Sequence, residues 1–191
     1  MLRVCAFWAL SLASLLLSGV VEAAQVPRPS PEFAIQMTDG RQELLSTHRG
    51  KVVALAFLLT YCSHCQQTTQ ILSKLQNEYG PKGFQVLGSA TEDMAAMAVP
   101  DFIKQFKPAF PVGYNPRNTV LEYLQHPAMF RLMMPQLVFV DRQGTIRAQY
   151  AGDDPFFSNQ EKNLREMIET LLKESSAQKK SGAAKARKKA S

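Results

Sequence analysis

The segment KVVALAFLLTYCSHC, residues 51–65, decides the fold. Residues 51–59 form a continuous apolar run rich in valine, leucine and phenylalanine, which is typical of a strand buried on both faces. Two cysteines, Cys62 and Cys65, follow this run. One helical stripe of apolar residues comes next: Ile71, Leu72, Leu75 and Tyr79. The sequence therefore predicts a buried strand that leads into a helix with two cysteines at its start.

The spacing of the two cysteines predicts a dithiol site. At the start of a helix, positions i and i+3 lie one turn apart on the same face, within reach of a disulfide. Cys62 at the N-terminus would lie next to unpaired backbone N–H groups and the positive end of the helix dipole. Both effects favour the thiolate, which is the nucleophilic form. We expect Cys62 to be the exposed, attacking thiol and Cys65 the shielded, resolving thiol.

Other uses of this cysteine pair are weaker predictions. A zinc site needs four ligands, and without a second cysteine pair His48, His64 and His126 would have to converge, so no metal is expected. Covalent haem requires a histidine directly after the second cysteine, where Gln66 stands, and no cofactor is expected. A purely structural disulfide stays open as an alternative, although a bridge that closes so short a loop constrains the unfolded chain little.

The rest of the chain alternates strands and helices. Further strands are expected at residues 84–88, 110–113, 137–141 and 145–151, the last two joined by a hairpin turn with Gly144 in the left-handed position. Helices are expected to begin at Pro100, at Pro116 behind an Asn115 cap, and near Ser158 or Asn159. This alternation predicts an α/β domain of three layers.

The N-terminus predicts export. One positive charge, an apolar run at residues 4–21 and small residues before Ala24 describe a signal peptide over residues 1–23, and an uncleaved membrane anchor is the alternative. Either places the domain outside the cytoplasm, in the periplasm or an equivalent compartment. Cys5 is then removed or buried in lipid. In an oxidising compartment the remaining pair forms a disulfide or cycles through one.

Charge separates the tail from the domain. The formal net charge is +6, yet residues 24–174 hold 15 basic and 15 acidic residues, whereas residues 175–191 hold six basic residues and no acid. We therefore expect a proline-rich linker at 24–31, a neutral domain at 32–174 that binds no nucleic acid, and a disordered basic tail at 175–191. The tail could contact an anionic membrane, and a merely solvated tail is the alternative.

Three segments carry a family resemblance: residues 50–57, 61–65 and 134–144. They resemble exported proteins of the TlpA/ResA type, over about residues 30–174. The resemblance implies a thioredoxin-like three-layer α/β/α fold with a central mixed sheet and an inserted strand–helix unit between Cys65 and Pro135. It also implies a thiol–disulfide oxidoreductase that acts on client proteins with thiols or disulfides and is recycled by an upstream redox partner, soluble or membrane-bound.

The resemblance also implies further site residues. Pro135 corresponds to the cis-proline that packs against the active-site disulfide, and Tyr61 and Met134 are the expected contacts with client proteins. A cis bond suits a tight turn before a buried strand, because proline cannot lie inside a central strand. An ordinary trans proline that starts an edge strand is the alternative.

The chain departs from the family pattern in its acids. Ala56 stands where thioredoxins commonly have a buried acid. In some ResA-type members an acidic residue soon follows the second cysteine, whereas here residues 66–68, which end at Thr68, include no acid. Proton transfer to Cys65 then needs another group or water, and Glu92 and Asp93 are candidates. The stronger expectation is that these two acids cap the next helix, where the helix dipole favours them.

His64 makes the redox direction an open question. A histidine directly before the second cysteine resembles oxidants of the DsbA and protein disulfide isomerase type. A protonated imidazole beside Cys62 would stabilise the thiolate, and hence make the disulfide more oxidising. Two other classes remain: a non-catalytic binding module with a permanent disulfide, and a thiol peroxidase. A thiol peroxidase of this fold requires a threonine three residues before the attacking cysteine, and this chain has Leu59 at that position.

Overall fold

The computed structural model describes residues 25–189, and the side chains of residues 25–174. The expected signal peptide at 1–23, with Cys5, lies outside the described residues. Within the described part of the chain, no helix is both long enough and apolar enough to span a bilayer.

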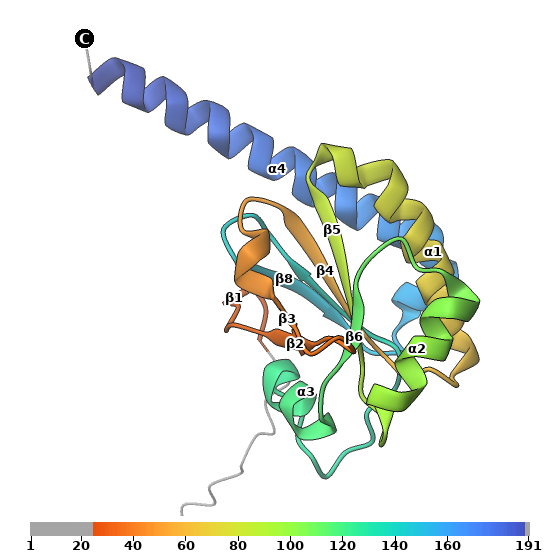
Figure 1. Cartoon of the computed structure of the whole chain (residues 1–191). Helices are drawn as coiled ribbons and strands as arrows, with labels where there is room; N and C mark the ends of the chain where they lie inside the picture. Colours follow the sequence, from red (N-terminus) through yellow and green to blue (C-terminus); the bar gives the residue numbers. More distant parts are fainter. Residues whose placement is uncertain (1–24, 190–191) are drawn as a thin grey trace, which may run out of the picture.

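The described residues form strands and helices in an alternating order (Figure 1). The strands are β1 (Arg28–Pro29), β2 (Ala34–Gln36), β3 (Gln42–Leu44), β4 (Val52–Leu58), β5 (Phe84–Ala90), β6 (Val112–Tyr114), β7 (Gln136–Val140) and β8 (Thr145–Tyr150). The α-helices are α1 (Ser63–Tyr79), α2 (Ala95–Phe106), α3 (Arg117–Leu124) and α4 (Gln160–Lys189). The short 3-10 helices are η1 (Leu45–His48), η2 (Gly80–Lys82) and η3 (Pro155–Asn159).

The strands form one mixed sheet in the order β1-β8-β7-β4-β5-β6-β2-β3. β4, β5 and β6 run parallel, while β7 pairs antiparallel with β4 and β8 antiparallel with β7. The predicted strand at residues 51–59 is therefore confirmed as β4, near the centre of the sheet. The hairpin between β7 and β8 is also confirmed, with Gly144 at a φ of 84°.

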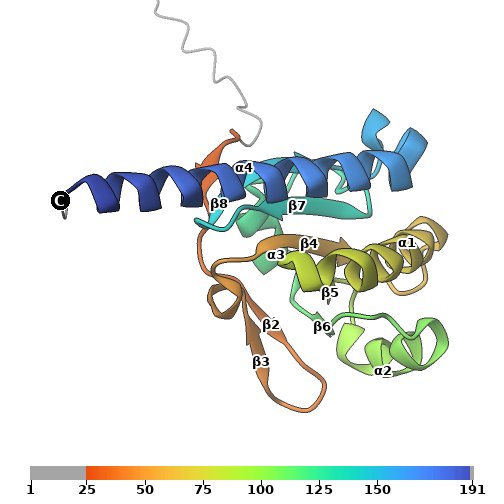
Figure 2. The ribbon, with the colours of Figure 1, turned by 90° about the horizontal axis from the view of Figure 1, so that it is seen from above.

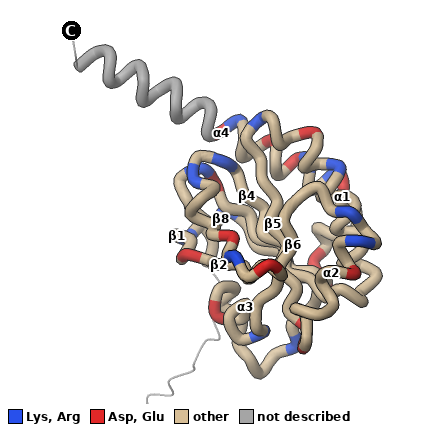
Figure 3. Tube along the Cα trace, in the orientation of Figure 1, with Lys and Arg blue, Asp and Glu red and all other residues tan. Residues whose placement is uncertain are grey.

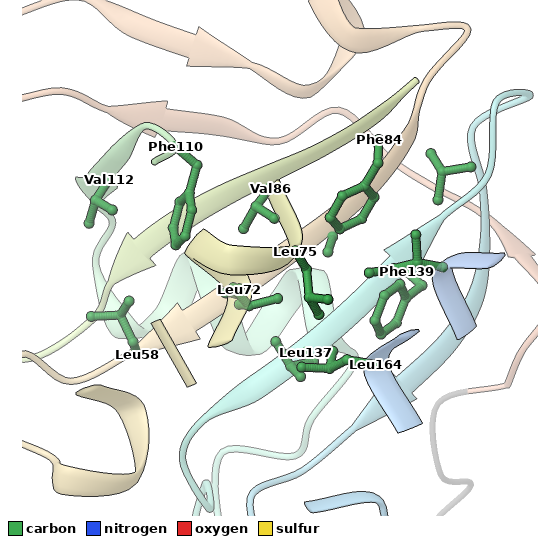
Figure 4. Packing of buried hydrophobic residues seen from close by; sticks show 14 of the residues in the cluster. Leu58, Leu72, Leu75, Phe84, Val86, Phe110, Val112, Leu137, Phe139 and Leu164 are labelled. Carbon is green, nitrogen blue, oxygen red and sulfur yellow. The ribbon is translucent and has the colours of Figure 1, made fainter. Parts of the chain in front are cut away.

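The residues of β4 alternate between two hydrophobic clusters. Val52, Ala54, Ala56 and Leu58 belong to the cluster that α1, α2 and α4 cover. Figure 4 shows this cluster, in which leucines of α1 and α4 pack on aromatic and aliphatic side chains of β5 and β7. Val53, Leu55 and Phe57 belong to the second cluster, which α3 and the N-terminal strands cover. The sheet thus lies between two layers, as Figures 1 and 2 show, and the three-layer fold is confirmed.

Two helix starts differ from the prediction. α2 begins at Ala95 and contains Pro100 in its interior, because residues 95–99 are good helix formers and bury Ala95 and Val99. Asn115 does not cap α3, whose N-cap is Pro116. The Asn115 side chain is instead buried, where it accepts a hydrogen bond from Ser89 Oγ at 2.8 Å and donates one to the backbone oxygen of Ala34 at 2.8 Å.

Both ends of the described chain are more regular than expected. Part of the predicted linker forms β1, which pairs with β8 at the edge of the sheet, where proline is tolerated. The hairpin of β2 and β3 was not predicted, because three-residue strands give no clear alternation. α4 continues to Lys189, through most of the segment expected to be disordered, since alanine, lysine and arginine favour helix.

Candidate active site

The two cysteines lie at the end of the sheet where the parallel strands have their C-termini; we call this end the dithiol edge. β4 ends at Leu58, the backbone turns so that Cys62 N–H donates to the Leu59 oxygen at 3.1 Å, and α1 begins at Ser63. Cys62 is the N-cap residue of α1, and its carbonyl oxygen accepts from Gln66 N–H at 3.0 Å. Cys65 follows in the first helical turn. The predicted position of the cysteine pair at the start of a helix is therefore confirmed.

The two thiols are free and differ in exposure. Cys62 is partly exposed, whereas Cys65 is 0% exposed. Burial raises the pKa of the Cys65 thiol well above its usual range, and a hydrogen bond with Cys62 raises it further. The backbone N–H of Leu59 donates to Cys65 Sγ at 3.5 Å and acts in the opposite direction. The expected order of exposure is confirmed: Cys62 is partly exposed, and Cys65 is fully buried.

His64 and Tyr61 are both on the surface. The His64 side chain is exposed on the first turn of α1, and its backbone oxygen accepts from the Thr68 hydroxyl at 2.8 Å. Because the side chain is exposed, solvent screens electrostatic interaction between it and Cys62. Tyr61 is 71% exposed directly before Cys62.

The peptide bond between Met134 and Pro135 is cis, as expected. Gln136 pairs with Phe57, so Pro135 stands one position further along, at the end of β4 where the loop to Cys62 begins. Met134 packs against the same cluster as Cys62, and Cys65 is a member of that cluster. The fold therefore brings Met134 and Pro135 to the end of the sheet that carries the dithiol.

Gly152 supports this segment, although the sequence pattern did not predict a role for it. Its N–H donates to the Met133 oxygen at 3.0 Å. A Cβ at this position would lie 2.3 Å from the backbone oxygen of Met134 and 3.0 Å from Pro135 N. The two backbone segments pack so closely that only glycine fits between them. A glycine two residues after the end of β8 was the available signal.

Glu92 is placed differently from the expectation. It does not cap α2, whose N-cap is Met94 without a side-chain cap. Glu92 Oε1 instead accepts hydrogen bonds from the Thr60 N–H at 3.0 Å and from the Thr60 hydroxyl. Its negative charge adds to the effect of burial on the pKa of Cys65. The loop that leads to the cysteines and the end of β5 are thus joined through a carboxylate, whereas Asp93 is exposed.

A cleft of about 510 Å³ lies beside this carboxylate. Residues 91–96, after β5, form one wall, and residues 114–118, which begin at the last residue of β6, form the other. Because β4, β5 and β6 are parallel, the cleft and the dithiol lie at the same edge of the sheet.

Exposed apolar side chains gather at this edge too. Among the described residues, six large hydrophobic side chains are exposed, and five of them lie here; we call these five the apolar rim: Tyr61, Met94, Met97, Met129 and Phe130. Tyr61 follows β4, Met94 and Met97 follow β5, and Met129 and Phe130 precede β7. These three strand ends meet at the lower end of the sheet in Figure 1. Large apolar side chains that are exposed close together are a common feature of binding surfaces.

The three histidines lie apart, on α1, on η1 and after α3, and His48 pairs with Glu43 at 2.7 Å. In the part of the chain that the structure describes, no three His, Cys, Asp or Glu side chains are arranged as a metal site.

Comparison with known proteins places the chain among redox proteins. Thiol-disulfide oxidoreductase ResA of Bacillus cereus is 25% identical over 133 residues, which are 69% of this chain and 73% of that protein. Thioredoxin-like protein YneN of Bacillus subtilis is 26% identical over 140 residues, 70% of this chain and 74% of that protein. A Chlorobium tepidum structure described as a candidate thiol:disulfide interchange protein DsbE superposes with a TM-score of 0.66 at 26% identity, covering 76% of this chain and 96% of that one.

The family model named Redoxin matches residues 25–168. This span contains both cysteines, the cis-proline and all strands of the described sheet. Sequence relatives, fold and site thus agree, and the chain belongs to the Redoxin family, as a thioredoxin-fold thiol–disulfide oxidoreductase similar to ResA.

Proposed function

We propose that the protein is an exported oxidoreductase that exchanges disulfides with client proteins, with Cys62 as the attacking and Cys65 as the resolving thiol. The difference in exposure between the two sulfurs carries this assignment, because only Cys62 is open to a protein-sized partner. Cys65 stays protonated behind it, since burial raises its pKa. The signal peptide or membrane anchor expected at residues 1–23 supports action outside the cytoplasm.

The exchange proceeds in two steps. The Cys62 thiolate attacks one sulfur of a client disulfide; the Cys62–client bond forms, and the other client sulfur leaves as a thiolate that takes up a proton. Cys65 then attacks the sulfur of Cys62 and releases the second client thiol. The client is reduced and the Cys62–Cys65 pair is oxidised. The same steps run backward when a client dithiol meets the oxidised pair, and an upstream redox partner, soluble or membrane-bound, restores the starting state.

The apolar rim supports client proteins as substrates. Flexible methionine side chains adapt to surfaces of different shape, which suits a protein that reacts with more than one client. In this proposal Tyr61 and Met134 contact the client chain on either side of the reacting disulfide. Pro135 positions the backbone between them and the dithiol, and His64 tunes the thiolate.

A trapping experiment tests the assignment. With Cys65→Ser, the first step still occurs but resolution does not, so mixed disulfides with client proteins should accumulate on Cys62 and disappear on reduction. The matched control Cys62→Ser should trap nothing. If Cys62→Ser trapped clients instead, the roles of the two thiols would be reversed. If neither variant trapped clients and Cys62 resisted alkylation after mild reduction, the protein would be a binding module with a permanent disulfide.

A further inference from the structure

We propose that Glu92 accepts the proton of Cys65 when Cys65 resolves the mixed disulfide, and returns it when the reaction runs backward. This inference rests on the proposed function and deepens it, because it concerns the same dithiol. It addresses a specific difficulty: Cys65 is fully buried, so its proton is not directly accessible to bulk water.

The loop before the cysteines holds the thiol and the carboxylate on neighbouring residues. Leu59 N–H donates to Cys65 Sγ at 3.5 Å, and the next N–H, that of Thr60, donates to Glu92 Oε1 at 3.0 Å. The Thr60 hydroxyl donates to the same carboxylate oxygen. The Gln66 side chain fixes this loop to α1, since its Nε2 donates to the Thr60 oxygen at 2.9 Å. One short segment therefore aligns the end of β5 with the first turn of α1.

The second oxygen of Glu92 is open for the proton. Both hydrogen bonds from Thr60 go to Oε1, whereas Oε2 is buried and has no hydrogen-bond partner among the described residues. A buried carboxylate oxygen without a partner is uncommon and calls for an explanation. A proton on Oε2 would leave the Thr60 contacts at Oε1 intact.

The neighbouring positions offer no equivalent acid. Ala56 of β4 carries no titratable group, and the Thr68 hydroxyl is engaged with the His64 oxygen at 2.8 Å. The other charged or titratable groups that line the cleft beside the carboxylate are Asp93, Tyr114 and Arg117. Asp93 and Arg117 are exposed to solvent, so water screens their influence.

The resolving step balances as follows. In the mixed disulfide, the S–H bond of Cys65 breaks and its proton binds to Glu92 Oε2. The Cys65 thiolate attacks the Cys62 sulfur, the Cys62–Cys65 bond forms, and the client sulfur leaves with the bonding electrons. That thiolate takes a proton from water. In the reverse direction a client thiolate attacks the Cys62–Cys65 bond, and Glu92 donates its proton to the departing Cys65.

The two steps can be observed separately with an aromatic disulfide. Dithionitrobenzoate releases one coloured thionitrobenzoate when Cys62 attacks it and a second when Cys65 resolves the adduct. We expect Glu92→Gln, which keeps the acceptor for Thr60 but cannot take a proton, to slow the second release about 100-fold at neutral pH, the scale of general base catalysis. The first release should keep its rate. The difference in the second release should shrink at alkaline pH, where hydroxide can remove the Cys65 proton.

Two further variants keep the test decisive. Asp93→Asn removes the adjacent exposed acid and should leave both releases unchanged. Thr60→Val removes the hydroxyl that holds Glu92 and should also slow only the second release; it decides the matter if Glu92→Gln does not fold, as judged by circular dichroism. An unchanged second release in the folded variants would overturn the role of Glu92. Absence of the first release in the wild-type protein would instead overturn the proposed function.

Discussion

At the scale of single residues, short contacts at the dithiol edge decide what each side chain can do. Cys62 and Cys65 are three positions apart, yet one faces solvent and the other is fully buried. His64, between them, lies on the exposed side of the helix. Motif and spacing predicted this division of the thiols, whereas the contact between Thr60 and Glu92 required the packing of two loops.

His64 should tune the redox potential only slightly. Its protonated form stabilises the Cys62 thiolate, and whatever stabilises the thiolate stabilises the reduced state. Because solvent screens the exposed imidazole, we expect His64→Pro to lower the reduction potential by about 30 mV, the equivalent of about 1.4 kcal/mol. Equilibration with glutathione measures the shift. A shift toward a higher potential would contradict the argument.

Gly152 should tolerate no side chain. In Gly152→Ala the new Cβ would meet backbone atoms of Met134 and Pro135, which cannot rotate away as a side chain can. We expect a loss of about 1–3 kcal/mol in the free energy of unfolding, measured by urea denaturation. Gly80→Ala is the control, since the Cβ there meets only the end of the Gln76 side chain, and it should cost less. Equal losses in the two variants would rule out the close approach at Gly152.

At the scale of helices and strands, apolar periodicity gave reliable predictions where elements are long. β4, β5, α1 and the β7–β8 hairpin were all predicted, because each has a continuous run, a helical stripe or a turn glycine. β2 and β3 escaped prediction, since strands of three residues owe their existence to pairing partners. Asn115 shows the same limit: next to Pro116 it reads as a cap, but its side chain joins β2 to β5.

Asn115 should therefore matter for stability rather than for helix capping. Asn115→Ala leaves the Ser89 hydroxyl and the Ala34 carbonyl oxygen without their partner in a buried position. We expect unfolding to become easier by about 1–3 kcal/mol, the cost of unsatisfied buried polar groups. Asn118→Ala, on the exposed face of α3, is the matched control and should change little. Chemical denaturation measures both; a neutral Asn115→Ala would show that the site reorganises or admits water.

At the scale of the whole molecule, the dithiol edge of the sheet differs from the rest of the surface in its exposed apolar side chains. Along the Cα trace in Figure 3, basic and acidic positions both occur over the described body, in keeping with the neutral charge of residues 24–174. The apolar rim lies at the edge where the dithiol and the cleft also lie. Because residues 24–174 carry no net charge, apolar contact is the expected basis for client recognition.

The rim should affect protein clients and not small disulfides. We expect the double variant Met129→Ser and Phe130→Ser to raise the KM for a protein disulfide by about 10-fold, since each buried apolar side chain contributes on the order of 1 kcal/mol or more. Its rate with dithionitrobenzoate should stay at the wild-type value. Equal losses with both substrates would mean that the variant disturbs the dithiol itself.

Stability should fall at alkaline pH. The pKa of Cys65 is raised in the folded state, so above about pH 8.5 the unfolded chain loses this proton while the folded protein keeps it. The free energy of unfolding should then fall by about 1.4 kcal/mol per pH unit. Burial also raises the pKa of Tyr123, to about 12, which adds a further loss between about pH 10 and 12. Denaturation of the reduced protein at pH 8 and 9.5 tests this; Cys65→Ala should lack the first decline.

The sequence by itself determined the three-layer fold, the buried strand that leads to the cysteines and the roles expected of the two thiols. These features depend on local periodicity and on spacing along the chain, which burial and helix geometry translate directly into structure. Only the tertiary structure decided that Glu92 contacts Thr60, that Gly152 touches Met134 and that Asn115 bridges strands. Those contacts join residues between 18 and 81 positions apart, and chain order sets no distance between such residues until the sheet brings its strand ends together.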